Sequence, residues 1–149
     1  WTHRDLKQQL ASLASVQAIL RGLTGIPVTE ELRRAQGRKA MDFQWAITEK
    51  AMKAREMLGE GQFYDSDYHE LMADHVAGIE RIYDWAGKTM SGRHADAIRQ
   101  WTAANAQTKH GAHKHSPEEF GMSADQVNAM FAPYTQRFGF GFGIRPGKA

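Results

Sequence analysis

Three histidines form the densest group of metal-binding side chains in the sequence. His110, His113 and His115 fall in one short segment together with Lys109 and Lys114. Imidazole nitrogens are ligands for zinc, copper and nickel, and His110 and His113 would share a face if the segment were helical. The two lysines repel a cation, and no carboxylate or thiolate is interleaved. The segment is a candidate metal site; the alternative is a solvated helix end, facing the negative end of the helix dipole.

A second candidate ligand is His75, which the periodicity places in the middle of an apolar helix face. One interpretation is a core histidine that hydrogen-bonds to a neighbouring helix. The other is a metal or cofactor ligand assisted by Asp74, His69 or Glu80. Di-iron bundles use a Glu-x-x-His pair, and the sequence has none, because Glu70 lies five residues before His75. A di-iron site is therefore not supported.

The sequence lacks the local motifs that mark common enzyme sites. It has no Gly-x-Ser-x-Gly elbow, no phosphate-binding P-loop and no His-Glu-x-x-His. It also has no cysteine, which excludes disulfides, thiolate metal sites and cysteine nucleophiles. The sequence therefore predicts a protein that is not an enzyme, although a triad assembled only in space leaves no such motif.

The C-terminal segment, residues 137–149, alternates large apolar residues with glycine. In an extended conformation the apolar side chains would all project to one side and leave the other side bare. An isolated strand would lack partners for its backbone groups. It could lie on its own helices, join a partner protein or stay in solvent, and we expect docking on a partner, with Arg145 adding an ionic contact. The apolar residues are Phe138, Phe140, Phe142 and Ile144.

The longest expected helix, residues 29–58, is apolar on two sides. Such a helix is either central or in contact with a partner. One stripe comprises Ala40, Phe43, Ile47, Ala51, Ala54 and Leu58. Another side carries Met41, Trp45 and Met52, which are therefore predicted to bind a partner.

Capping residues and helix breaks position these candidates on four to five helices. The connections are short, which favours antiparallel neighbours. We therefore predict an all-α, up-and-down helical bundle at residues 1–136, followed by the extended aromatic–glycine tail at residues 137–149. No strand pattern precedes the tail, and Ser116-Pro117 predicts one further helical turn that ends at Gly121. The expected helices cover residues 4–23, 29–58, 67–86, 93–109 and 123–133.

The first helix shows a clear apolar periodicity. Large apolar residues recur at steps of three and four, which predicts a single buried stripe. Its members are Leu6, Leu10, Leu13, Val16, Leu20 and Leu23.

Composition limits the other possibilities. The 149 residues, of which 42% are hydrophobic, are enough for one core. No segment approaches the roughly 18 apolar residues of a membrane span. The net charge is +2 and the basic residues are scattered, so binding of nucleic acid is not predicted. The chain starts at Trp1 rather than methionine, which predicts a trimmed chain or a removed leader and favours a processed or exported protein (periplasm, organelle or virion) over a cytoplasmic one.

Residues 58–113 contain short motifs that are similar to those of a known family. The matching residues are Phe63 or Tyr64 with Asp65, Tyr68, Asp74-His75, and His110 or His113. They resemble the second half of a family of bacterial exported, four-helix, ferritin-like domains of unknown function. The resemblance implies a four-helix bundle and export, and it implies no reaction.

These observations predict a non-catalytic structural or interaction subunit of a larger assembly. It would dock on other protein subunits, including copies of itself, through the C-terminal tail, and it would need no cofactor. The alternative is an exported four-helix bundle that binds a small ligand, or zinc, copper or iron, through His75 or the cluster of His110, His113 and His115.

Overall fold

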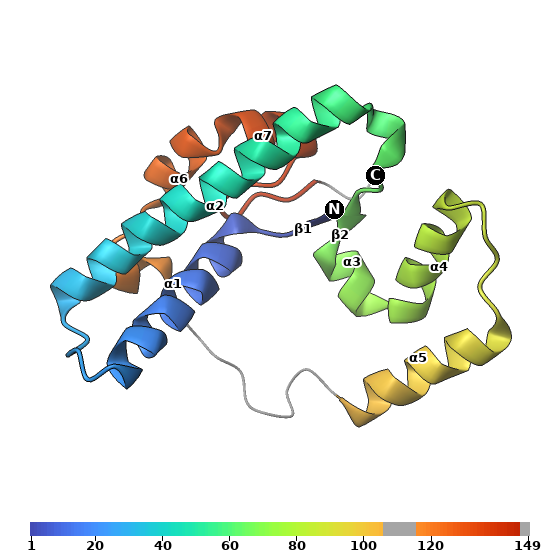
Figure 1. The fold of residues 1–149 in the computed structure, drawn as a ribbon, viewed down its shortest axis with the longest axis horizontal. Coiled ribbons are helices and arrows are strands. Elements are labelled where there is room, and N and C mark those ends of the chain that lie inside the picture. Colours follow the sequence, from blue (N-terminus) through green and yellow to red (C-terminus); the bar gives the residue numbers. More distant parts are fainter. Residues whose placement is uncertain (106–115, 147–149) are drawn as a thin grey trace. The chain divides into compact units, whose positions relative to one another are not determined.

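The computed structural model describes residues 1–105 and 116–146 of the chain. It divides into two compact units: unit 1 comprises Trp1–His3 and Gly61–His113, and unit 2 comprises Arg4–Glu60 and Lys114–Ala149. The described residues form seven α-helices, two 3-10 helices and a two-stranded sheet (Figure 1). The mostly helical class is confirmed. The expected up-and-down bundle is not, because these helices do not form a clear four-helix bundle.

A helical hairpin is the scaffold of unit 2. Helices α1 (Leu6–Leu23) and α2 (Glu30–Leu58) pack side by side, as Figure 1 shows. Thr29 caps α2 through its side-chain oxygen, which accepts from Leu32 N at 3.2 Å, as its position in the sequence predicts. The cap of α1 is Asp5, so this helix starts two residues later than expected.

The buried face of α1 differs from the predicted stripe. Leu6 and Leu10 are buried as expected. Beyond them the helix buries the small residues Ala11, Ala14, Ser15 and Ala18, which allow close approach to α2. The large residues at the C-terminal end of the stripe are exposed instead; these are Val16, Leu20 and Leu23.

On α2, too, the buried face differs from the predicted one. Phe43, Ile47 and Leu58, which belong to the predicted main stripe, are exposed. The buried face lies on the side that carries Met41 and continues through polar residues. Its members are Gln36, Gly37, Ala40, Met41, Thr48 and Arg55.

Three short elements complete unit 2: the 3-10 helix η2 (Pro117–Phe120), α6 (Ala124–Met130) and α7 (Ala132–Phe138). The single turn at η2 is confirmed, and Gly121 ends it with a φ of 65°, a left-handed conformation that suits glycine. Ser123 and Gln126 form a capping box at the start of α6, where the sequence predicts a helix. η2 packs against both α1 and α2.

Unit 1 joins a small sheet to three helices. Strand β1 (Thr2–His3) pairs in parallel with β2 (Ser66–Asp67), so the fold contains a small sheet that the all-α prediction lacks. The helices are α3 (Tyr68–Ala73), α4 (His75–Trp85) and α5 (Gly92–Ala104). A short 3-10 helix, η1 (Glu60–Gln62), precedes the sheet in the sequence.

The single helix expected over residues 67–86 is broken at Asp74. Its side chain accepts a hydrogen bond from Ala77 N at 3.0 Å, so it caps a new helix instead of continuing the old one. His75 is therefore the first residue of α4 and does not lie in mid-helix. No helix in the described part of the chain is long and apolar enough to cross a membrane.

Candidate functional site

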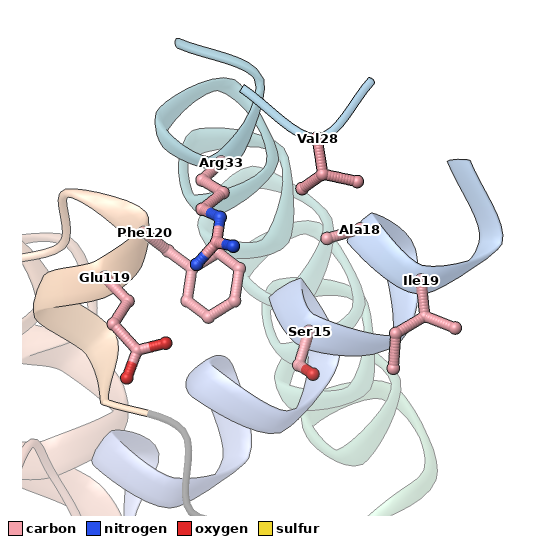
Figure 2. Close-up of a pocket in the computed structure, with 7 residues that line it drawn as sticks. All are labelled: Ser15, Ala18, Ile19, Val28, Arg33, Glu119 and Phe120. Carbon is pink, nitrogen blue, oxygen red and sulfur yellow. The ribbon is translucent and has the colours of Figure 1, made fainter. Parts of the chain in front are cut away.

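A pocket of about 250 Å³ opens between α1, the start of α2 and η2. Aliphatic side chains form one side of the pocket, and Arg33, Glu119 and Phe120 complete its lining (Figure 2). Within the described residues Arg33 makes no ion pair or hydrogen bond through its side chain. An arginine that has no partner among the described residues and lies in a partly apolar pocket is suited to binding a ligand and not to catalysing a reaction. The lining residues are Ser15, Ala18, Ile19, Val28, Arg33, Glu119 and Phe120.

Unit 1 contains a buried histidine paired with a carboxylate. His3 Nε2 lies 2.7 Å from Asp65 Oδ1, and the side chain of His3 is only 2% exposed. The ring of Trp1 stacks on that of His3 at a centroid distance of 5.1 Å. A carboxylate orients an imidazole in this way in proton-transfer sites. The contact between His3 and Asp65 also connects β1 to the residue that directly precedes β2.

Sequence reasoning did not find this pair as a site. His3 and Asp65 are 62 residues apart, and no motif in the sequence links the two segments. The parallel pairing of Thr2 with Ser66 and of His3 with Asp67 brings them together. Two-residue strands give no alternating pattern, so no local signal could have revealed the contact.

A second charged cluster joins the C-terminal ends of α2 and α7 within unit 2. The side chain of Arg55 is 3% exposed, and its Nη2 and Nε lie 2.5 and 3.1 Å from Glu60 Oε2. Arg137 also pairs with Glu60, and the Phe138 ring lies 5.1 Å from Arg55 Cζ. The hydrogen bond from Arg55, and also the charge of Arg137, holds the pKa of the Glu60 carboxyl below its ordinary value.

We expect this cluster to contribute to stability only while Glu60 is ionised. A lowered pKa in the folded state gives stabilisation that is present above the ordinary value near 4.5 and is lost as the pH falls through the lowered value. Urea unfolding of the wild type and Glu60→Gln should therefore differ at about pH 6 and converge towards about pH 3. The difference should be small, since Glu60 is 57% exposed, and it should shrink with added salt. An unchanged difference across this range would contradict the assignment.

The C-terminal tail is not the extended ladder that the sequence predicts. Helix α7 runs to Phe138, so the predicted domain boundary at 136/137 falls inside a helix. Gly139 and Gly143 adopt φ values of 77° and 70° and turn the backbone. Phe138, Phe140, Phe142 and Ile144 therefore do not project from one strand.

The turned tail packs on its own unit. Leu6 N donates to Gly141 O at 3.1 Å, and Gly143 N donates to Asp5 Oδ1 at 2.9 Å. Phe140 is 5% exposed, whereas Ile144 is 42% exposed. Phe142 is half-buried, with Lys7 Nζ 5.8 Å from the centre of its ring, and Arg145 is exposed.

The other predicted partner-binding residues lie mainly inside unit 2. Met41 is 7% exposed and belongs to the core. Trp45 is half-buried and makes an edge-to-face contact with Phe131 at 5.5 Å, and Met52 is also half-buried. The predicted role of these three residues in binding a partner stays a prediction.

The predicted metal ligands are not assembled in the described structure. His75 is half-buried at the start of α4, and the residues described contain no group of three or more histidine, cysteine or acidic side chains placed to hold a metal ion. His110, His113 and His115 lie outside the described residues.

No family model and no curated protein matches this chain. Among solved structures it is similar to the sulfotransferase STF9 from Mycobacterium avium, with a TM-score of 0.77 and 25% sequence identity. The match covers 93% of this chain and 35% of that protein, so the chain spans about a third of its length. The resemblance of residues 58–113 to ferritin-like domains is therefore wrong, because nearly the whole chain follows part of a sulfotransferase instead.

Proposed function

We propose that this chain is the helical portion of a sulfotransferase-type enzyme. The observation that carries the proposal is the likeness to part of STF9, which extends over both units and nearly all of the sequence. The remaining two thirds of that protein have no counterpart here, so under this proposal further residues complete the enzyme. The assembly subunit predicted from the sequence stays a prediction, and the tail that motivated it packs on its own unit.

Sulfuryl transfer sets clear demands on the protein. The acceptor oxygen or nitrogen forms a bond to the sulfur of an activated sulfate, the bond from sulfur to the leaving oxygen breaks, and the acceptor loses its proton. Negative charge grows on the leaving oxygen in the transition state. Fixed cationic donors and helix N-termini stabilise such charge best.

Arg4 is our candidate for the residue that holds the anionic donor. It directly precedes Asp5, the N-cap of the 18-residue helix α1, where the helix dipole favours an anion. Its Nε is buried and its Nη2 donates to Gln8 Oε1 at 3.1 Å, so the guanidinium is held in place. Asp5 already accepts from Lys7 N and Gly143 N, and Leu6 N donates to Gly141 O, so a donor anion bound here would contact the side chain of Arg4 and not these amides.

The test is a transfer assay on the polypeptide that contains this chain. A radiolabelled mixed anhydride of phosphoric and sulfuric acid serves as the donor, and phenols, alcohols and amines serve as acceptors. We expect labelled acceptor, and Arg4→Ala should raise the KM for the donor at least about 10-fold, with partial recovery in Arg4→Lys.

Arg21→Ala is the matched control, because Arg21 is an exposed arginine in the last turn of the same helix and does not line the pocket. It should leave the KM unchanged. The absence of transfer to any acceptor class would refute the proposed function. A loss in Arg33→Ala with none in Arg4→Ala would move the anion site to the pocket.

A further inference from the structure

Helix α1 presents a second apolar face that no described residue of unit 2 covers. Four large aliphatic residues near its C-terminal end follow each other at steps of three, one and three. Their exposed fractions are 51% for Val16, 54% for Ile19, 58% for Leu20 and 79% for Leu23. Residues at this spacing lie on one side of a helix. We call these four residues the outer stripe.

The outer stripe lies opposite the face that packs on α2. Residues two positions apart in an α-helix are separated by about 200° around its axis. Ala14 and Ala18 are buried, and Val16 and Leu20 follow them by two positions. The C-terminal half of α1 is therefore apolar on both sides, which is typical of a helix enclosed within a larger fold.

The outer stripe continues into the pocket. Ile19 lines the pocket with Val28, which is 36% exposed, and Ile26 in the same connection is 42% exposed. Figure 2 shows Ile19 and Val28 on the side of the pocket away from Glu119. The surface thus has a ridge of aliphatic side chains beside the pocket. The side chains of another element can pack against such a ridge and into such a pocket.

The size of this surface argues for cover from the same polypeptide. The outer stripe consists of four side chains along about 10 Å of helix, whereas a stable dimer buries roughly 800 Å² and about 20 to 30 residues on each partner. Contiguous apolar patches are uncommon on monomers and mark surfaces that pack on something. The similar solved protein suggests what could cover this surface. The match covers 35% of that protein, so the other 65% (100 − 35) lies outside the match.

We infer that the outer stripe of α1 packs against the remaining part of the sulfotransferase-type polypeptide, with the pocket receiving one of its apolar side chains. This inference rests on the proposed function. It assigns α1 a position between α2 on one side and the rest of the enzyme on the other.

Thiol labelling tests the inference, because the chain has no cysteine of its own. Leu20→Cys is placed in the 149-residue chain and in the polypeptide that contains it, and maleimide incorporation is followed by mass spectrometry of the peptide. We expect rapid labelling in the chain alone and labelling on the order of 100-fold slower in the longer polypeptide. Met57→Cys is the control, because Met57 is 85% exposed and should react equally in both.

The melting temperature of a charged variant is an independent test of the inference. Leu20→Glu should leave the melting temperature of the isolated chain unchanged and lower that of the longer polypeptide, whereas Met57→Glu should change neither. Equal labelling of Leu20→Cys in both forms would overturn the inference. Protection of the isolated chain that grows with its concentration would also overturn it, in favour of a second copy. Neither measurement needs activity, so protection without sulfuryl transfer would refute the proposed function alone.

Discussion

Replacing Gly37 with alanine should lower the free energy of unfolding of unit 2 by about 2 kcal/mol. Gly37 lies in α2 where η2 crosses it, and a Cβ built there overlaps the carbonyl oxygen of Phe120 and lies 3.0 Å from its carbonyl carbon. The obstacle is backbone, so η2 itself must move to make room. The better helix propensity of alanine offsets about 1 kcal/mol of this cost. Urea unfolding followed by circular dichroism measures the change.

Gly22→Ala is the matched control in the same unit. Gly22 lies in α1, and an added Cβ would meet only Val28 Cγ2 at 3.4 Å, an ordinary contact. This variant should be neutral or more stable by up to about 1 kcal/mol. If both variants had the same effect, the close approach of η2 to α2 would not constrain the fold.

Capping chemistry made several helix boundaries predictable. Thr29, Asp67 and Ser123 all cap helices as their residue types indicate, because their side chains satisfy amide groups within a few residues. The turn at Ser116-Pro117 follows from the same short-range physics. Asp74 shows the limit of such reasoning, since it also caps a helix, and in a continuous apolar pattern that role was not recognised.

Burial was less predictable than the helices themselves. On α1 the pattern of large residues is real, but two faces carry it, and small residues decide which face meets α2. Ala14 and Ala18 are buried while Val16 and Leu20 are exposed. A periodicity of large side chains cannot separate a face that packs in the unit from a face that packs elsewhere, because both are apolar.

The candidate site could not be read from the sequence for a different reason. His3 and Asp65 meet through a sheet of two-residue strands, and Arg137 reaches Glu60, the partner of Arg55, only when α7 lies beside α2. Such contacts depend on the fold as a whole. The likeness to a sulfotransferase likewise emerged from the backbone arrangement at 25% identity and not from any motif.

Phe140→Ala should destabilise unit 2 by about 3 kcal/mol, the usual cost of removing a buried phenylalanine ring. Phe140 is 5% exposed although it lies in the C-terminal tail. Its carbonyl oxygen accepts from Thr135 Oγ1 at 2.8 Å, which fixes the turn after α7. Thermal or urea unfolding of the purified chain measures the loss. Ile144→Ala is the control, because this residue is 42% exposed, and it should cost less than about 1 kcal/mol.

The same pair of variants separates the two accounts of the tail. If the tail served mainly to dock on a partner, Phe140→Ala would leave the isolated chain as stable as the wild type and would weaken association instead. If the tail is part of the core of unit 2, the loss appears in the monomer and at every protein concentration. We expect the second result, because the backbone of the tail already pairs with Leu6, Asp5 and Asn128 of its own chain. Breaking those contacts to reach a partner would expose Phe140 and leave the first amide of α1 without its acceptor.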